Sequence, residues 1–210
     1  MATETGSYLL CGTGGHAIEV AAEFPGLFGA VFDPYCELAS FEGLRVLRNL
    51  EDARRAGLEL GVIAVGVPAV AHRIFTELTD GGLALAPPLV SPHAVIAGTH
   101  VEIGDGTLIM AGVVIADRVR VGRSCVLNRM CTIGHGAHLG DFVSVMPLTA
   151  LSGGVHLHEA CYIGASAFVK ENVTIARGTT VGAMSGVFTD IEEPGGVWVG
   201  SPARPHKVDG

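Results

Sequence analysis

The sequence contains no long uninterrupted hydrophobic run, although 49% of its 210 residues are hydrophobic. A membrane-spanning helix requires about 18 or more consecutive apolar residues, and no such stretch occurs. Residues 1–5 (MATET) also lack the basic segment that opens a secretory signal peptide. These absences predict a soluble, cytoplasmic protein with no membrane partner, which buries much of its apolar surface between subunits.

Basic side chains are also scarce. Thirteen Lys and Arg residues face twenty-one Asp and Glu residues, which gives a formal net charge of −8. Nucleic acids and anionic membranes attract proteins through excess positive charge. Neither is therefore expected as the main partner. Low-complexity segments and coiled-coil heptads are absent as well.

An aliphatic residue recurs at every sixth position over a long stretch of the chain. Helices and strands have periods of about 3.6 and 2 residues, and neither produces a period of six. This period is typical of a hexapeptide-repeat β-helix, in which each unit forms one side of a prism and the aliphatic side chain points inward. Three units complete one coil, so residues eighteen apart lie about 4.7–4.9 Å above one another. The positions are Ile103, Ile109, Ile115, Val121, Leu127, Ile133, Leu139, Val145, Leu151, Leu157, Ile163, Val169, Ile175, Val181 and Val187.

The cysteines fit this repeat, and no CxxC pair occurs among them. Three of the five, Cys125, Cys131 and Cys161, stand two residues before an inward aliphatic residue. Val, Thr and Ala fill the same position in other repeats, so the position requires a small side chain. We expect these cysteines to be core residues, and neither metal ligands, disulfide partners nor nucleophiles.

The first 88 residues follow a different pattern, in which short apolar runs alternate with helical stretches. Strands are expected over residues 7–11, 27–33, 43–47 and 60–66, and helices over 16–24, 49–56 and 69–79. This alternation predicts a small Rossmann-like βαβ domain with a parallel sheet. Two prolines then mark a boundary, so we divide the chain into residues 1–88, a β-helix over 89–193 and a tail over 194–210.

A glycine-rich turn, Gly12-Thr-Gly-Gly-His16, joins the first expected strand to the first helix. Glycines allow a ligand to approach the backbone, and a helix N-terminus favours phosphate. Asp33 ends the second strand about twenty residues later, where an acid can bind ribose hydroxyls. Together these residues indicate a nucleotide-containing ligand. The alternatives are a plain turn with a solvated Asp33, or an NAD(P)-linked enzyme for which the chain leaves little room.

His135 is the main catalytic candidate within the repeat. It follows the inward Ile133 by two residues, so it is expected at a prism corner, facing outward. A neutral imidazole there can accept a proton from an attacking amine or hydroxyl. The alternative is a plain surface histidine. His138, His156 and His158 lie nearby in sequence, but their spacing does not match known β-helix metal sites, so no metal is expected.

The glycine turn followed by the unbroken repeat resembles the sugar acyltransferases of the sialic-acid O-acetyltransferase and bacillosamine N-acetyltransferase type. The resemblance spans nearly the whole chain and is most specific over residues 11–20, 126–135, 139–142, 150–155 and 200–203. It implies an α/β domain that binds a nucleotide sugar, followed by a left-handed parallel β-helix. It also implies acetyl-CoA as co-substrate and a homotrimer with active sites between the subunits.

Carried over by position, the resemblance makes His135 the general base and Asn128 a polar residue near the acceptor. The positions that it implies for nucleotide-sugar binding are Gly14, Gly15, His16 and Asp33. The positions where it implies that the coil backbone faces the pantetheine of acetyl-CoA are Gly153, Ala165 and Ala183.

Two departures from the family pattern concern the catalytic residues. The family usually has Asp or Glu directly after the catalytic histidine, where this chain has Gly136, and often a second histidine where this chain has Ser144. Loss of the acid leaves an imidazole less firmly oriented. Asp117 lies one coil above His135, and we hypothesise that it replaces the missing acid; a solvated corner residue is the alternative. Ser144 is expected to donate a hydrogen bond to the thioester oxygen.

These features predict an acetyl-CoA-dependent acyltransferase that acetylates an amino group of a nucleotide-linked sugar by direct transfer. An amine is nucleophilic once neutral and needs a base less than a hydroxyl does, so the weakened catalytic pair favours N-acylation. Two alternatives stay open. One is O-acetylation of a sugar hydroxyl, and the other is a non-catalytic scaffold or binding trimer, for which Gly136 is the best argument.

Overall fold

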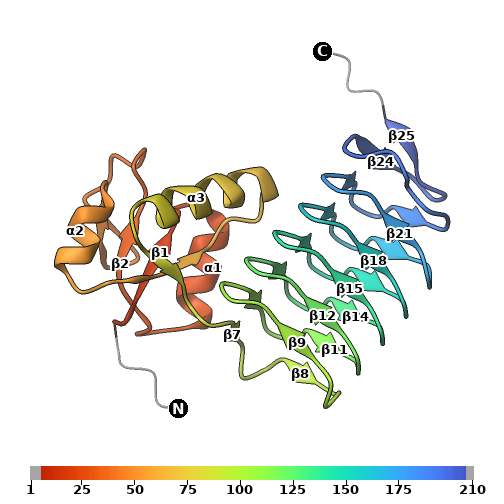
Figure 1. The fold of residues 1–210 in the computed structure, drawn as a ribbon, viewed down its shortest axis with the longest axis horizontal. Helices are drawn as coiled ribbons and strands as arrows, with labels where there is room; N and C mark the ends of the chain where they lie inside the picture. The colour runs from red at the N-terminus through yellow and green to blue at the C-terminus, as the bar shows by residue number, and fades with distance from the viewer. Residues whose placement is uncertain (1–5, 207–210) are drawn as a thin grey trace. The chain divides into compact units, whose positions relative to one another are not determined.

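The structure, a computed structural model, describes residues 6–206 and consists of two compact units, residues 1–87 and 88–210 (Figure 1). Residues 1–5, which carry no basic segment, and residues 207–210 lie outside the described part of the chain. No helix among the described residues is long and apolar enough to cross a membrane.

The first unit is a six-stranded sheet with three helices, so the prediction of a Rossmann-like α/β domain is confirmed. The strands in spatial order are β3 (Ser40–Phe41), β4 (Leu44–Leu47), β2 (Phe28–Phe32), β1 (Tyr8–Cys11), β5 (Leu60–Ile63) and β6 (Ala84–Leu85). Strand β1 pairs in parallel with both β2 and β5, while β3 is antiparallel to β4. The strand order reverses at β1, and ligands of such sheets bind at the carboxyl ends of the strands beside this point.

Local sequence determines where each of the three helices begins. α1 (Gly15–Glu23) begins directly after the extended Gly14. α2 (Leu50–Arg55) is capped by Asn49, whose side-chain oxygen accepts a hydrogen bond from the backbone N–H of Asp52 at 2.9 Å. α3 (Pro68–Asp80) begins with a proline, which needs no N–H partner in the first turn.

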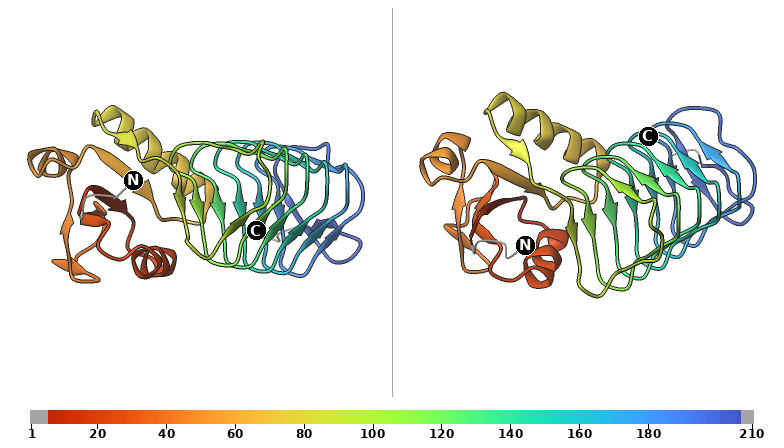
Figure 2. Two further views of the ribbon diagram at one scale, coloured as in Figure 1. Left: turned by 90° about the horizontal axis from the view of Figure 1, so that it is seen from below. Right: turned by 60° about the horizontal axis from the view of Figure 1, so that its bottom comes forward.

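The second unit is a left-handed parallel β-helix with three flat sides (Figures 1 and 2). The first side contains β7 (Leu89–Val90), β10 (Leu108–Ile109), β13 (Val126–Leu127), β16 (Ser144–Val145), β19 (Tyr162–Ile163), β22 (Thr180–Val181), β24 (Val197–Val199) and β25 (Arg204–His206). The second side contains β8 (Val95–Ile96), β11 (Val114–Ile115), β14 (Thr132–Ile133), β17 (Ala150–Leu151), β20 (Phe168–Val169) and β23 (Gly186–Val187). The third side contains β9 (Glu102–Ile103), β12 (Arg120–Val121), β15 (His138–Leu139), β18 (His156–Leu157) and β21 (Thr174–Ile175).

The register of these strands follows the predicted step of eighteen residues. Val114 pairs with Thr132, and Arg120 pairs with His138. We call the edge between the first and second sides the 1/2 edge, and the edge between the second and third sides the 2/3 edge. At the C-terminal end, β24 pairs in parallel with β22 and β25 folds back antiparallel on β24. The described part of the expected tail therefore extends the sheet of the first side.

The repeated aliphatic residues fill the interior of the prism. All of them from Ile109 to Val187 are buried, and Ile103, in the first full coil, is partly buried. Each buried side chain of this size contributes about 1.5–3 kcal/mol relative to exposure. The period of six therefore supplies the core of the second unit.

The three cysteines of the repeat belong to the same core, as predicted, and their thiols are free. Cys125 donates to the carbonyl of Gly140 at 3.1 Å, and Cys161 donates to that of Ala176 at 3.2 Å. Burial raises the pKa of Cys125, Cys131 and Cys161 to about 12, so these thiols stay protonated at neutral pH. A buried, protonated thiol is a poor nucleophile.

Each turn from the one between β9 and β10 to the one between β22 and β23 contains a residue with positive φ. These residues recur at every sixth position from Gly106 to Met184, with φ between 49° and 73°. Gly136 is one of them, with φ of 67°, a conformation that glycine adopts without steric cost. Glycine is therefore well suited to the backbone conformation at position 136, where the family that the chain resembles usually has an acid.

Candidate functional site

His135 lies on the 2/3 edge, in the turn between β14 and β15, and is exposed as predicted. Its ring lies against Gly153 in the following coil. A Cβ atom added to Gly153 would come within 2.6 Å of ring atoms Cε1 and Nε2 of His135. The backbone N–H of Gly154 donates to the His135 carbonyl at 2.8 Å, which anchors the turn to the following coil. The imidazole is thus open to solvent but rests on a glycine that leaves room for it.

Asp117 lies on the same edge one coil earlier, but its carboxylate points away from His135. Its Oδ1 accepts a hydrogen bond from the backbone N–H of His100 at 3.0 Å and lies 3.3 Å from Nδ1 of the same residue. The bond from the His100 N–H lowers the pKa of the Asp117 carboxyl group. The carboxylate bends toward the preceding coil, over Gly98, whereas the His135 ring bends over Gly153 of the following coil. The structure therefore does not bring these two side chains together.

The other candidates of the β-helix lie away from His135. Ser144, in β16 on the first side, is only 2% exposed, so it does not present its hydroxyl to a ligand. Asn128, on the 1/2 edge, is 6% exposed, and its side-chain oxygen accepts the Arg129 N–H at 2.7 Å. Ala165 and Ala183 follow on the same edge in later coils. One side of six residues spans on the order of 15–20 Å, so the candidates of the two edges do not form one site within a single chain.

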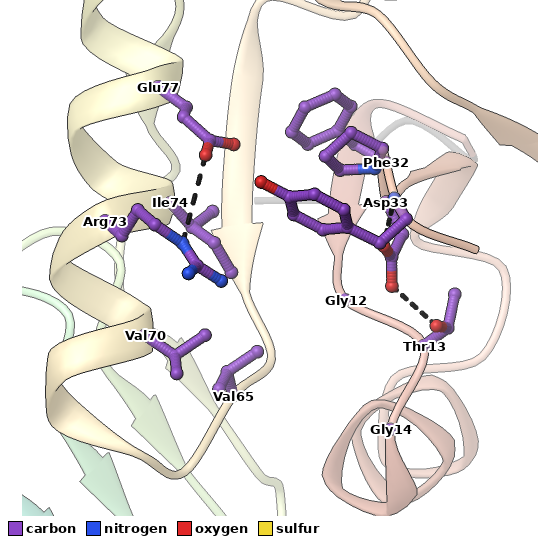
Figure 3. Close-up of a pocket in the computed structure, with 12 residues that line it drawn as sticks. Gly12, Thr13, Gly14, Phe32, Asp33, Val65, Val70, Arg73, Ile74 and Glu77 are labelled. Atoms are coloured by element: carbon purple, nitrogen blue, oxygen red, sulfur yellow. Dashed lines mark hydrogen bonds and ion pairs between the residues drawn. The ribbon is translucent and has the colours of Figure 1, made fainter.

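In the first unit, the glycine turn borders a cavity at the carboxyl ends of β1, β2 and β5 (Figure 3). The cavity encloses about 150 Å³. Pockets for whole drug-sized ligands measure about 300–1,000 Å³, so this one has room for a single ring system with the remainder of a ligand outside. The residues that line it are Gly12, Thr13, Gly14, Phe32, Asp33, Pro34, Tyr35, Val65, Val70, Arg73, Ile74 and Glu77.

Two hydrogen bonds fix the Asp33 carboxylate at this cavity. The Thr13 hydroxyl donates to Oδ2 at 2.6 Å, and the backbone N–H of Tyr35 donates to Oδ1 at 3.0 Å (Figure 3). The structure therefore brings Asp33 and Gly14 to one cavity, as the glycine turn suggests. Gly15 and His16 begin α1 without lining the cavity, and His16 Nδ1 lies 3.4 Å from Glu19 Oε2.

Sequence reasoning misses two further residues of the cavity, Tyr35 and Arg73. The Arg73 guanidinium carbon lies 5.7 Å from the centre of the Tyr35 ring, and Nε lies 4.0 Å from Glu77 Oε1. Tyr35 is 73% exposed, so its ring offers a flat surface for stacking. The spacing of Arg73 and Glu77 on one helix is visible in the sequence, but their approach to the loop after β2 is a tertiary contact.

Three histidines stack along the third side of the β-helix. The ring centres of His138 and His156 are 4.7 Å apart, and those of His156 and His158 are 4.4 Å apart. Desolvation, together with repulsion from the other two rings, lowers the pKa of His156. Within residues 6–206, no group of three or more His, Cys, Asp or Glu side chains is arranged to hold a metal ion.

Among known sequences, the family model for the bacterial transferase hexapeptide (six repeats) matches residues 100–135. The UDP-3-O-acylglucosamine N-acyltransferase 2 of Rhodopseudomonas palustris (strain BisB18) is 31% identical over 113 residues, which are 54% of this chain and 30% of that protein. The chain matches about a third of the length of such curated relatives.

Solved structures match nearly the whole chain. PerB from Caulobacter crescentus, in complex with CoA and GDP-perosamine, has a TM-score of 0.87 and 27% identity over 96% of this chain and 98% of that chain. The acetyltransferase domain of PglB from Neisseria gonorrhoeae FA1090, in complex with acetyl coenzyme A, has a TM-score of 0.84 and 26% identity over 96% of this chain and 100% of that chain. Both units of the present fold therefore have counterparts in these proteins.

Proposed function

Because the chain is similar to hexapeptide-repeat sugar acyltransferases over nearly its whole length, we propose that it transfers an acetyl group from acetyl-CoA to an amino group of a nucleotide-linked sugar. The observation that carries the proposal is the exposed His135, which packs on Gly153 in a chain that also has a ring-sized cavity beside Asp33. The CoA and GDP-perosamine bound to PerB support the two substrate classes.

His135 acts as the general base in this proposal. Its neutral imidazole accepts a proton from the amine while the nitrogen attacks the thioester carbonyl. A C–N bond forms, the tetrahedral oxyanion is stabilised by backbone N–H groups, and the C–S bond then breaks. The leaving thiolate takes the proton back from the imidazolium. In the described chain no carboxylate bonds to His135, so packing on Gly153 orients the ring. A base without an orienting acid suits an amine better than a hydroxyl, because a neutral amine is already nucleophilic.

Acetyl-CoA is assigned to the backbone at Gly153, Ala165 and Ala183. Ala165 and Ala183 lie on the 1/2 edge, whereas His135 and Gly153 lie on the 2/3 edge. A complete site then needs the 2/3 edge of one copy to face the 1/2 edge of another. This requirement supports a homotrimer with its active sites between neighbouring subunits.

The nucleotide is assigned to the cavity of the first unit. Asp33 accepts hydrogen bonds from the ribose hydroxyls there, and the N-terminus of α1 after Gly14 attracts the diphosphate. Gly15 and His16 belong to this helix start. The resemblance assigns Asn128 to a position near the acceptor sugar.

Asp33→Asn is expected to weaken binding of GDP or UDP about 10-fold or more, because hydrogen bonds to a charged group are worth about 1.5–3 kcal/mol. The amide oxygen still accepts the Tyr35 N–H, so the loop keeps its shape. Isothermal titration measures the dissociation constants, with Asp80→Asn on α3 as the control. Equal affinities for wild type and Asp33→Asn would contradict the assignment.

Asp117→Asn distinguishes two roles for Asp117. An orienting acid would make kcat fall by orders of magnitude, whereas the observed contacts with His100 predict a kcat near that of the wild type. Steady-state kinetics at saturating acetyl-CoA measures the difference. A large loss of kcat would show that the carboxylate turns toward His135 during the reaction.

Release of free thiol from acetyl-CoA tests the function directly. The full chain is assayed with GDP- and UDP-linked amino sugars and with the corresponding hydroxyl sugars. The proposal predicts release with an amino acceptor. Release only with hydroxyl acceptors supports O-acetylation, and binding of acetyl-CoA without release from any acceptor supports a non-catalytic scaffold.

A further inference from the structure

One wall of the cavity in the first unit combines charged and apolar side chains from a single face of α3. Arg73 and Glu77 stand four positions apart, so they project from the same side of the helix, together with Val70 and Ile74. Figure 3 shows these four side chains extending toward the end of β2, where Asp33 lies. The cavity therefore offers a flat ligand an apolar wall with a carboxylate and a guanidinium beside each other.

The Glu77 carboxylate lies largely inside the first unit. Its side chain is only 32% exposed. Burial, with a further contribution from the negative charge of Glu77, raises the pKa of the Cys11 thiol, which places the carboxylate near the end of β1. Within the described part of the chain its ion-pair partner is Arg73, whose Nε lies 4.0 Å from Oε1, beyond hydrogen-bond distance. Both carboxylate oxygens can therefore accept hydrogen bonds from a ligand.

Arg73 supplies hydrogen-bond donors next to this acid. Its side chain is 57% exposed, and its guanidinium carbon lies 5.7 Å from the centre of the Tyr35 ring. A guanidinium group donates only, and a carboxylate accepts only. A ligand that contacts both groups must present N–H donors to Glu77 and acceptor atoms to Arg73.

The nucleobases differ in whether they can meet this requirement. A carboxylate binds most strongly to two adjacent N–H donors. Guanine has such an edge, formed by N1–H and the 2-amino group, and it carries the acceptors O6 and N7 beside that edge. Uracil and thymine have an acceptor oxygen on each side of N3–H, so this edge repels a carboxylate. Adenine and cytosine pair one amino group with a ring nitrogen that accepts.

We propose that the cavity selects guanine, with Glu77 accepting from N1–H and the 2-amino group and Arg73 donating to O6 or N7. This inference rests on the proposed function and makes the substrate an amino sugar linked to guanosine diphosphate. Asp33 remains the partner of the ribose hydroxyls in the same cavity. The base specificity of the protein is then contained in the first unit.

GDP and inosine diphosphate (IDP) test this assignment, because IDP lacks only the 2-amino group. Isothermal titration of the full chain is expected to show that GDP binds about 10-fold or more tightly than IDP, and that both bind more tightly than UDP. Glu77→Gln is expected to weaken GDP binding about 10- to 100-fold and to bring the GDP and IDP affinities close together, because the amide N–H₂ meets a donor of guanine. Arg73→Gln is expected to weaken GDP and IDP binding by the same factor, since both bases carry O6 and N7.

Glu59→Gln is the matched control. Glu59 is exposed and directly precedes β5, whereas the cavity lies at the carboxyl end of that strand. Its GDP and IDP affinities are expected to equal those of the wild type. Thermal unfolding verifies that the variants are folded, and the comparison of GDP with IDP in the wild type needs no variant.

The outcomes separate this inference from the proposed function. Equal affinities of the wild type for GDP and IDP, or tighter binding of UDP, would overturn the guanine assignment, while acetyl transfer to a UDP-linked amino sugar would leave the proposed function intact. A preference for GDP that Glu77→Gln retains would overturn the role of Glu77. If no acceptor releases thiol but Glu77→Gln abolishes the preference for GDP over IDP, the proposed function fails and the guanine site stands.

Discussion

Replacement of His135 by asparagine is expected to lower kcat for acetyl transfer by about 10²- to 10⁴-fold, the usual contribution of a general base. Asparagine keeps a polar side chain of similar size but cannot accept the proton of the attacking amine at neutral pH. The KM for acetyl-CoA is expected to change little, because its assigned contacts are with backbone. Steady-state release of thiol measures both constants.

The fold of this variant is expected to survive, because His135 is exposed and no described hydrogen bond uses its side chain. His93→Asn is the matched control, since it changes another exposed histidine of the β-helix outside the proposed site. A His135→Asn protein that keeps kcat within a few-fold of the wild type would remove His135 from the mechanism. Equal losses in both variants would indicate a general effect on the β-helix.

Gly153→Ala is expected to lower kcat about 100-fold, the cost of a small misplacement of a catalytic group. The added Cβ would lie within 2.6 Å of Cε1 and Nε2 of His135, so the ring has to swing away from the edge. The three atoms nearest to that Cβ all belong to the His135 ring, and the backbone of Gly153 is outside the left-handed region. The substitution therefore acts on the base, with little effect on the melting temperature.

A double-mutant cycle shows whether Gly153 acts through His135. If it does, Gly153→Ala lowers kcat in the wild type but lowers it no further in the His135→Asn background. Glu171→Ala, one coil below Gly153 on the same edge, controls for changes to that edge and is expected to be neutral. Full activity of Gly153→Ala would contradict the packing that we assign to the base.

The architecture of the β-helix is predictable because one residue type at one period defines its core. The step of eighteen places Asp117, His135 and Gly153 on one edge, and the structure agrees. The six-residue period does not determine whether a side chain on the edge points toward the preceding or the following coil. Asp117 turns toward the preceding coil because the His100 N–H offers a hydrogen bond there, and no sequence pattern contains that information.

Burial and tertiary contacts explain the other differences. The sequence suggests that Ser144 donates a hydrogen bond to the thioester oxygen, but it does not reveal that the side chain is buried. In the first unit, the longer strands and the three helices are predictable from apolar patterns. Strands β3 and β6 are not predictable, because a strand of two residues is too short to show an alternating pattern. The approach of Arg73 to Tyr35 joins residues far apart in the chain and needs the folded sheet.

The product of the reaction tests the central claim most directly. The full chain is incubated with ¹³C-acetyl-CoA and a GDP- or UDP-linked amino sugar, and the nucleotide sugar is then analysed by mass spectrometry and NMR. The proposal predicts a single labelled acetyl group bound as an amide to the sugar nitrogen, formed by the wild type and nearly abolished by His135→Asn. An ester at a sugar hydroxyl, or no acetylated product from any amino sugar that binds, would contradict it.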